Sequence, residues 1–87
     1  MYLHLGQSVV VPFGDVIGIF DLDTSSWSHK TRSFLERCEK EGRVVSATRD
    51  IPRTFTLCKG KDKPATVYLS QLSPATLKGR MEGNGLE

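Results

Sequence analysis

Six cationic side chains gathered in one short segment are the residues whose types and spacing suggest chemistry. The segment reads RVVSATRDIPRTFTLCKGKDK, and its cations are Arg43, Arg49, Arg53, Lys59, Lys61 and Lys63. Two carboxylates accompany them, so the segment carries +4 although the whole chain carries +2. Guanidinium groups donate paired hydrogen bonds to phosphate, and spaced ammonium groups can follow a sugar–phosphate backbone. The pattern therefore indicates a polyanionic partner such as a nucleic acid.

The same charges have a plainer interpretation, which the spacing alone leaves open. A charged hairpin tip keeps a sheet edge soluble, and a run of charge is often only a solvated surface. About six phosphate contacts from a single monomer also give weak binding that is sensitive to salt. A ring or filament that repeats the segment would raise the affinity through effective concentration.

Residues that could catalyse a reaction are isolated from one another. His4 and His29 have no acid or cysteine at a useful spacing, so we interpret both as structural. Asp21 and Asp23 could hold a cation at a strand end, but short acids before a helix favour capping. The glycines match neither a phosphate-binding loop nor a dinucleotide fingerprint. We therefore predict that the protein is not an enzyme and has no metal site or cofactor.

Length and composition indicate one small globular domain. The 87 residues are 38% hydrophobic and 25% charged, which argues against disorder. No apolar run approaches the roughly 20 residues that cross a membrane, and the start lacks a signal peptide, so we expect a cytoplasmic protein. Cys38 and Cys58 form no CxxC pair and are predicted to be reduced and buried. We expect residues 1–82 to form the domain and 83–87 a flexible tail, whose Leu86-Glu87 end could come from an expression vector.

The first half of the chain predicts strands followed by a helix. Short strands are expected over residues 2–5 and 8–11. The apolar run from Asp15 to Asp21 predicts a central strand covered on both faces, in which Gly18 marks a bulge or a close approach. A helix follows, with Gly42 as its stop and an apolar face at helical spacing. That face consists of Trp27, Thr31, Phe34, Leu35 and Cys38.

The second half predicts a strand over residues 43–47, a loop over 49–53, and a hairpin of strands 54–58 and 65–70. Ser73 and Pro74 then begin a short helix that runs to about Met81, with Leu72 and Leu77 spaced as a hydrophobic staple. The predicted fold class is α+β. It consists of a small, mostly antiparallel sheet, one long amphipathic helix of four or five turns, and a short C-terminal helix.

Three stretches of the chain resemble the bacterial extracellular matrix regulatory protein family. They are MYLHLGQSVVVPFGDVIGIFDLD, the helix that ends at Gly42, and VYLSQLSPATLKGR. The similarity runs along nearly the whole chain to about Met81 and rests on short segments rather than on a catalytic signature. The Met-Tyr-x-His-Leu-Gly start is similar to the RemB-like branch of the family.

The resemblance implies a DNA-binding regulator of biofilm matrix genes. Members of the better-studied branch form rings that present arginines around the rim, with DNA along the outside. That branch has an adjacent arginine pair after an Ala-Thr dipeptide, where this chain continues with Arg49-Asp-Ile-Pro-Arg53. It also has an arginine before the third strand, where this chain has Asp15. What carries over is the basic character of the loop, to Arg49 and Arg53.

Two hypotheses follow from these residues. The first is a homo-oligomeric DNA-binding regulator in which Arg49 and Arg53 contact phosphate, helped by the three lysines, with Arg43 a weaker candidate. The second is an oligomeric scaffold that binds another protein and no DNA, because Asp15 and Asp50 stand where a DNA-binding protein would favour cations. A hydrolase or transferase is rejected, because only isolated histidines could serve it.

Overall fold

Strand β5 (Thr54–Cys58) lies inside a four-stranded sheet, between β3 (Val16–Asp21) and β6 (Thr66–Ser70). Strand β4 (Val44–Ser46) completes the order β3-β5-β6-β4. Both neighbours of β5 run antiparallel to it, whereas β4 runs parallel to β6. The computed structural model describes residues 1–23, 29–60, 62 and 64–82; Trp27 and the predicted 83–87 tail lie outside this range.

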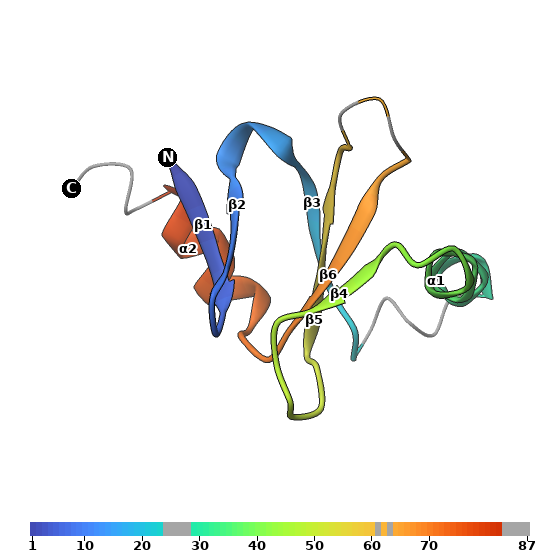
Figure 1. Ribbon diagram of the computed structural model, residues 1–87. Coiled ribbons are helices and arrows are strands. Elements are labelled where there is room, and N and C mark those ends of the chain that lie inside the picture. The colour runs from blue at the N-terminus through green and yellow to red at the C-terminus, as the bar shows by residue number, and fades with distance from the viewer. Residues whose placement is uncertain (24–28, 61, 63, 83–87) are drawn as a thin grey trace.

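The remaining elements cover the two faces of this sheet (Figure 1). A separate antiparallel hairpin of β1 (Tyr2–Gly6) and β2 (Val9–Pro12) lies on one face with α2 (Pro74–Glu82). Helix α1 (His29–Lys40) lies on the other face, and a 3-10 turn, η1 (Phe13–Asp15), joins β2 to β3. The layers contain both helices and mostly antiparallel strands, which confirms the predicted α+β class.

Two hydrophobic cores sit on the two faces of the four-stranded sheet. The core under β1, β2 and α2 consists of Leu3, Leu5, Val11, Ala47, Cys58 and Leu77. The core under α1 consists of Cys38, Phe55 and Val67. Since Phe55 belongs to one core and Cys58 to the other, β5 is covered on both sides. Both cysteines are buried and free, as predicted.

The prediction that residues 15–21 form the central strand is wrong, because β3 is an edge strand. Ile17 is 57% exposed and Phe20 is 37% exposed. A short apolar run cannot distinguish an edge strand from a central one, since both bury at least one face. The apolar residues of β3 pack against the neighbouring strand: the ring of Phe20 stacks on that of Phe55 in β5, with centroids 4.9 Å apart.

The glycine prediction within the same strand is confirmed. The pairing register shifts between Val16 and Gly18, which marks a bulge. A Cβ at position 18 would lie 2.8 Å from two ring carbons of Phe20. The ring therefore needs the bare backbone of Gly18 beneath it.

The end of α1 and the start of α2 have the capping interactions that the sequence predicts. Gly42 has φ of +71°, its N–H donates to the Glu39 carbonyl, and the Arg43 N–H donates to the Cys38 carbonyl. These two bonds form the Schellman motif that ends α1. At the start of α2, Ser73 Oγ accepts from the Thr76 N–H at 3.1 Å.

No helix in the described part of the chain is both long and apolar enough to span a membrane.

Candidate nucleic-acid interface

The structure divides the predicted cations between opposite ends of β5. Arg49 and Arg53 lie in the loop that enters β5, and Lys59 lies directly after it. Figure 1 shows the β4–β5 loop and the β5–β6 loop at opposite ends of the sheet. Five residues of strand place the two loops about 15 Å apart or more. The arginines and Lys59 therefore do not form one continuous patch within a subunit. Lys61 and Lys63 lie outside the described residues.

Residues 47–53, which we call the arginine loop, are fixed at both ends by the backbone of the sheet. The Ala47 N–H donates to the Leu69 carbonyl at 2.8 Å, and the Arg53 N–H donates to the Ser70 carbonyl at 2.8 Å. The Arg53 carbonyl in turn accepts from the Leu22 N–H at 2.9 Å. The strands on either side of β5 thus hold the base of the loop.

Thr48 organises the interior of the arginine loop. Its hydroxyl accepts from the Asp50 N–H at 3.0 Å and makes a 3.0 Å hydrogen bond with Gln71 Oε1. Its carbonyl accepts from the Ser46 hydroxyl at 2.7 Å. Sequence analysis missed this residue, although a threonine directly before exposed charges is a common signal for a side-chain-capped turn. The turn directs Arg49 and Asp50 outward from a buried threonine.

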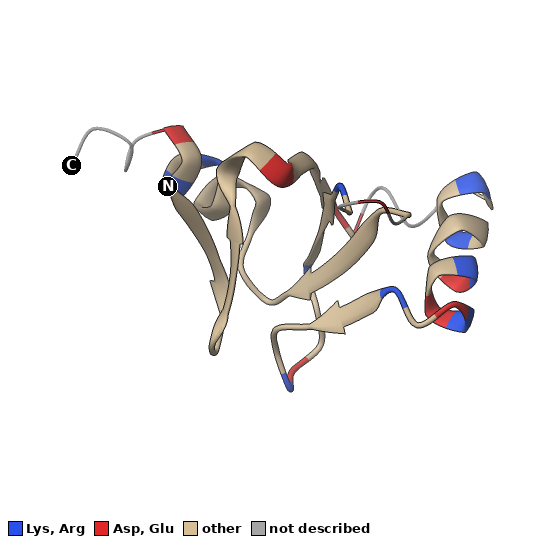
Figure 2. Ribbon diagram, turned by 45° about the horizontal axis from the view of Figure 1, so that its top comes forward, with Lys and Arg blue, Asp and Glu red and all other residues tan. Residues whose placement is uncertain are grey.

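The tip of the arginine loop faces solvent. Arg49, Asp50, Ile51 and Arg53 are exposed, whereas Pro52 is half-buried. Within residues 1–23, 29–60, 62 and 64–82, no side-chain hydrogen bond or ion pair engages either guanidinium. Figure 2 shows this loop projecting from the sheets with charged residues at its tip. Both arginines are therefore available to an external anion.

The opposite end of β5 presents a more mixed charge. The Lys59 side chain is exposed, but its backbone N–H donates to the Asp15 carbonyl at 2.8 Å, so an acidic residue adjoins it. Asp62, also exposed, lies at the hairpin tip with φ of 60°. Carboxylates on both sides of Lys59 weaken the local positive potential, so this end is the poorer phosphate site.

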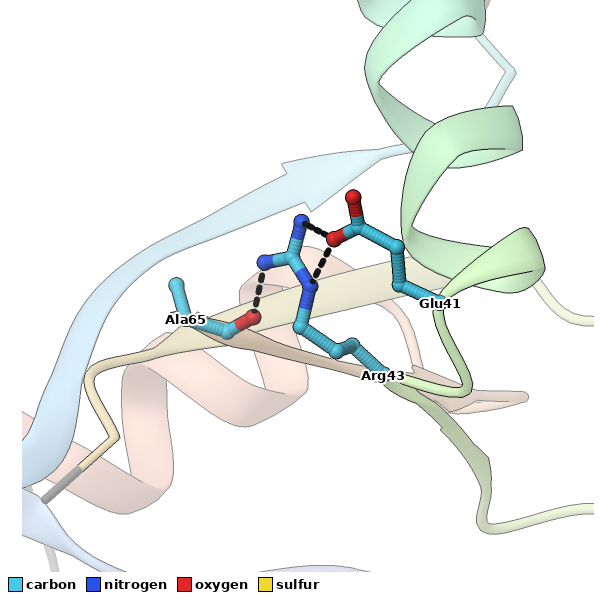
Figure 3. A network of polar contacts seen from close by, with 3 residues as sticks. All are labelled: Glu41, Arg43 and Ala65. Carbon is cyan, nitrogen blue, oxygen red and sulfur yellow. Dashed lines mark hydrogen bonds and ion pairs between the residues drawn. The ribbon is translucent and has the colours of Figure 1, made fainter. Parts of the chain in front are cut away.

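Arg43 is engaged inside the protein (Figure 3). Its Nε and Nη2 contact Glu41 Oε1 at 2.7 and 2.6 Å, and its Nη1 donates to the Ala65 carbonyl at 2.6 Å. The side chain is only 16% exposed. These contacts connect the end of α1 to the start of β6, so contact with phosphate would compete with a structural role.

The titratable groups of the described residues can be compared with those that catalysis or metal binding would need. The described residues contain no cluster of three histidine, cysteine or acidic side chains that could hold a metal ion. Burial, reinforced by the negative charge of Asp15, raises the pKa of the Cys58 thiol to about 11. The pKa of Tyr68 is also raised, chiefly by burial and then by the charges of Cys58 and Asp15. Both groups are therefore protonated at neutral pH and are poor nucleophiles.

Comparison with known proteins gives one informative relative. Extracellular matrix regulatory protein B of Bacillus subtilis (strain 168) is 32% identical to the chain over 82 residues. The matched region covers 94% of this chain and 91% of that protein. No family model matches the chain.

Proposed function

The chain belongs to the extracellular matrix regulatory protein family, and from that premise we propose that it is a DNA-binding transcriptional regulator of biofilm matrix genes. It acts in the cytoplasm as a homo-oligomer and not as an enzyme. Its partner is double-stranded DNA, which it contacts mainly through phosphates. Such contacts fix the position of the protein on the duplex, while the shape of the DNA supplies selectivity.

The arginine loop is the observation that carries this proposal. It combines two exposed guanidiniums that have no partner among the described residues with a backbone that is hydrogen-bonded at both ends. Guanidinium groups bind phosphate oxygens through paired, charge-assisted hydrogen bonds. A fixed loop loses little conformational freedom on binding, which favours affinity. Arg49 and Arg53 are therefore the primary contacts.

The remaining cations have lesser roles. Lys59 lies at the far end of β5, so it reaches a different stretch of DNA or a duplex bound by a neighbouring subunit. Lys61 and Lys63 belong to the same hairpin loop in the sequence and would act with it. Arg43 contributes least, because its guanidinium already contacts Glu41 and Ala65.

Assembly is needed because one arginine loop supplies only two strong contacts. Two phosphate contacts give weak binding at physiological salt, whereas several linked loops bind as one multivalent unit. The β3 edge supports such assembly, because an edge strand offers unpaired backbone groups to another chain. Ile17 and Phe20 add exposed apolar surface on that strand. Repetition of the subunit would then place many arginine loops on one particle.

Substitution of both loop arginines tests the proposed contact site. Arg49→Ala/Arg53→Ala is compared with Arg32→Ala/Arg37→Ala, which removes the same charge from α1. Fluorescence anisotropy with a long duplex at several salt concentrations gives affinity and its salt dependence. For every phosphate that the protein no longer neutralises, the slope of log K against log salt should fall by about one. We expect the loop pair to change both quantities far more than the helix pair, and equal low-salt affinity for the two pairs would refute the site.

A protein-binding scaffold is the second candidate, favoured by Asp50 between the two arginines and by the open β3 edge. It requires an oligomer that does not bind duplex DNA at low salt. Light scattering combined with the same titration separates the two functions. A monodisperse monomer at micromolar concentration would contradict both.

A further inference from the structure

Ile51, at the tip of the arginine loop, is the most exposed large apolar side chain in the described part of the protein. It is 86% exposed, compared with 64% for Met1 and Tyr2 at the chain start. Exposed apolar residues scattered singly are common. This one is unusual in its place, because it lies two residues from Arg49 on one side and two from Arg53 on the other.

The backbone that follows Ile51 is held against the sheet. Pro52 is half-buried and lines a cavity of about 250 Å³ together with Leu22, Val44 and Leu69. Its ring also fixes the backbone φ and restricts the conformation of the residue before it. With Arg53 hydrogen-bonded to Ser70, the backbone after Ile51 is anchored to the sheet. An apolar side chain is thus presented outward on a stiff support.

The spacing of the charges fits a groove in duplex DNA. Four residues span at most about 14 Å, and the minor groove of B-DNA is about 6 Å wide. A separation within that limit would let Arg49 and Arg53 reach the phosphates on either side of such a groove, with Ile51 placed between them toward its floor. Proteins that bind the minor groove frequently insert an apolar side chain between base pairs in this setting, which kinks the duplex.

We propose that Ile51 is an apolar wedge that enters the minor groove and partly unstacks one base step. This inference rests on the proposed DNA binding and adds that the bound duplex is bent at the unstacked step. Arg49 and Arg53 hold the flanking phosphates while the wedge opens the step. The preferred sites contain flexible pyrimidine–purine steps such as TA, because unstacking them costs least.

The charged flanks favour DNA over a second copy of the chain as the partner of Ile51. If Ile51 were buried in a neighbouring subunit, two guanidiniums beside it would be removed from water. Such desolvation is expensive unless each charge finds a matching carboxylate. DNA offers an apolar base step and phosphates together, so it satisfies all three side chains.

A bending assay tests the wedge. Duplexes of about 30 base pairs, labelled at both ends, carry either a central TA step or a stiff A-tract. Energy transfer reports the bend, and anisotropy reports the affinity. We expect the unsubstituted protein to raise energy transfer on the TA duplex. Ile51→Ala should abolish this rise and lower affinity for the TA duplex about tenfold, as expected when one buried apolar side chain is truncated.

Four further measurements test the wedge. The salt slope should be the same for Ile51→Ala and for the unsubstituted protein, because no phosphate contact is removed. Ile51→Leu should retain the bend, and Val10→Ala, at an exposed position on β2, should change nothing. Light scattering on each variant should show an unchanged particle mass.

The results that would contradict the wedge can be told apart from those that would contradict DNA binding. If Ile51→Ala bends the TA duplex as strongly as the unsubstituted protein, the wedge is wrong while DNA binding stands. A lower particle mass for Ile51→Ala would assign Ile51 to a contact between subunits and overturn the wedge. If the unsubstituted protein binds no duplex at low salt, the proposed function itself fails, and this inference fails with it.

Discussion

At the scale of single residues, Asp50 should limit the affinity of the arginine loop for DNA. Its exposed carboxylate lies directly between Arg49 and Ile51 and forms no ion pair within the described residues. Asp50→Asn removes the repulsion of phosphate while the backbone N–H that contacts Thr48 is retained. We expect duplex affinity to rise about threefold at low salt, with a smaller gain at high salt. Anisotropy titrations at two salt concentrations measure both.

Asp62→Asn is the matched control for Asp50→Asn. It removes the same charge from an exposed position at the other end of β5. Its effect should be the smaller of the two, because the arginines are remote from it. Equal gains for the two variants would show that total charge, and not the arginine loop, determines affinity.

The buried thiol of Cys58 predicts a loss of stability at high pH. Its pKa is about 11 in the folded protein, above the ordinary value of 9.0. In alkaline solution the unfolded chain therefore loses this proton first, so the free energy of unfolding falls between about pH 9 and pH 11. The loss due to Cys58 is at most about 3 kcal/mol. Urea unfolding under reducing conditions, from pH 8 to pH 11, measures it.

Cys58→Ala removes the titrating group and should flatten this pH dependence. A smaller slope should persist, because the raised pKa of Tyr68 acts in the same direction. The substitution also leaves a small cavity, which lowers stability equally at all pH values. An unchanged slope in Cys58→Ala would contradict the assignment.

The sequence shows where the cations lie along the chain but not which of them are already engaged. Arg43 has the charge of a phosphate contact, and charge alone does not reveal spatial neighbours. One of its partners, Ala65, lies 22 residues away in the chain and meets it only after β4 pairs with β6. For Thr48, neighbouring residues signal the local turn, but the hydrogen bond with Gln71, 23 residues away, does not follow from the sequence.

At the scale of elements, two glycines should respond in opposite ways to alanine. Gly42 has φ of +71° and open space around its Cα, so Gly42→Ala is opposed only by the backbone conformation. We expect a loss of about 1–2 kcal/mol in the free energy of unfolding. Gly79 lies within α2 with open space around it, so Gly79→Ala should add up to about 1 kcal/mol. Urea or thermal unfolding measures both.

A stabilising effect of Gly42→Ala would show that the Schellman motif does not constrain the end of α1. The Gly79→Ala variant supplies the comparison, because it makes the same chemical change within a regular helix. The two glycines thus separate a backbone requirement from ordinary helix propensity.

Elements with local chemistry can be predicted from the sequence, whereas the order of strands cannot. The ends of α1 and α2 follow from neighbouring residues such as Gly42 and Ser73, and the hairpin of β5 and β6 follows from alternation. Strand order depends on contacts between distant segments. The apolar run of β3 therefore suggests a central strand, whereas β5, with its threonines, occupies that place. Thr54 can be buried in this central strand because its hydroxyl donates a hydrogen bond to the Leu72 carbonyl at 3.0 Å.

At the scale of the whole molecule, the sequence predicts that the two basic loops act together, but β5 separates them. Arg49 and Lys59 are only ten residues apart in sequence. The extended strand between them turns this short separation into opposite ends of the sheet. Composition shows how much charge a segment carries, and only the fold shows where that charge is presented.

If subunits pair through the open β3 edge, as proposed above, a charge placed on that edge should disrupt assembly. Ile17 is 57% exposed and borders an apolar groove of about 460 Å³ between β3 and α2. In Ile17→Lys, a second subunit would have to bury an ammonium group on pairing with this edge. We expect light scattering to show a shift toward monomer, together with weaker DNA binding because the loops are no longer linked.

Val10→Lys introduces the same charge at an exposed position on β2 and should leave the particle mass unchanged. If both variants keep the mass of the unsubstituted protein, the subunit contact lies on another face. A change with Val10→Lys alone would assign the contact to the β1–β2 hairpin.

The position of β5 between β3 and β6 also bears on how the protein is made. During synthesis, β3 emerges from the ribosome more than thirty residues before its only partner within the four-stranded sheet. Until β5 follows, the apolar residues of β3 have no strand to pair with, and β4 must wait for β6. Pairing of β5 with β6 closes the shortest loop in that sheet and is the favoured nucleus. We therefore expect the nascent chain to be most prone to aggregate before β6 has left the ribosome.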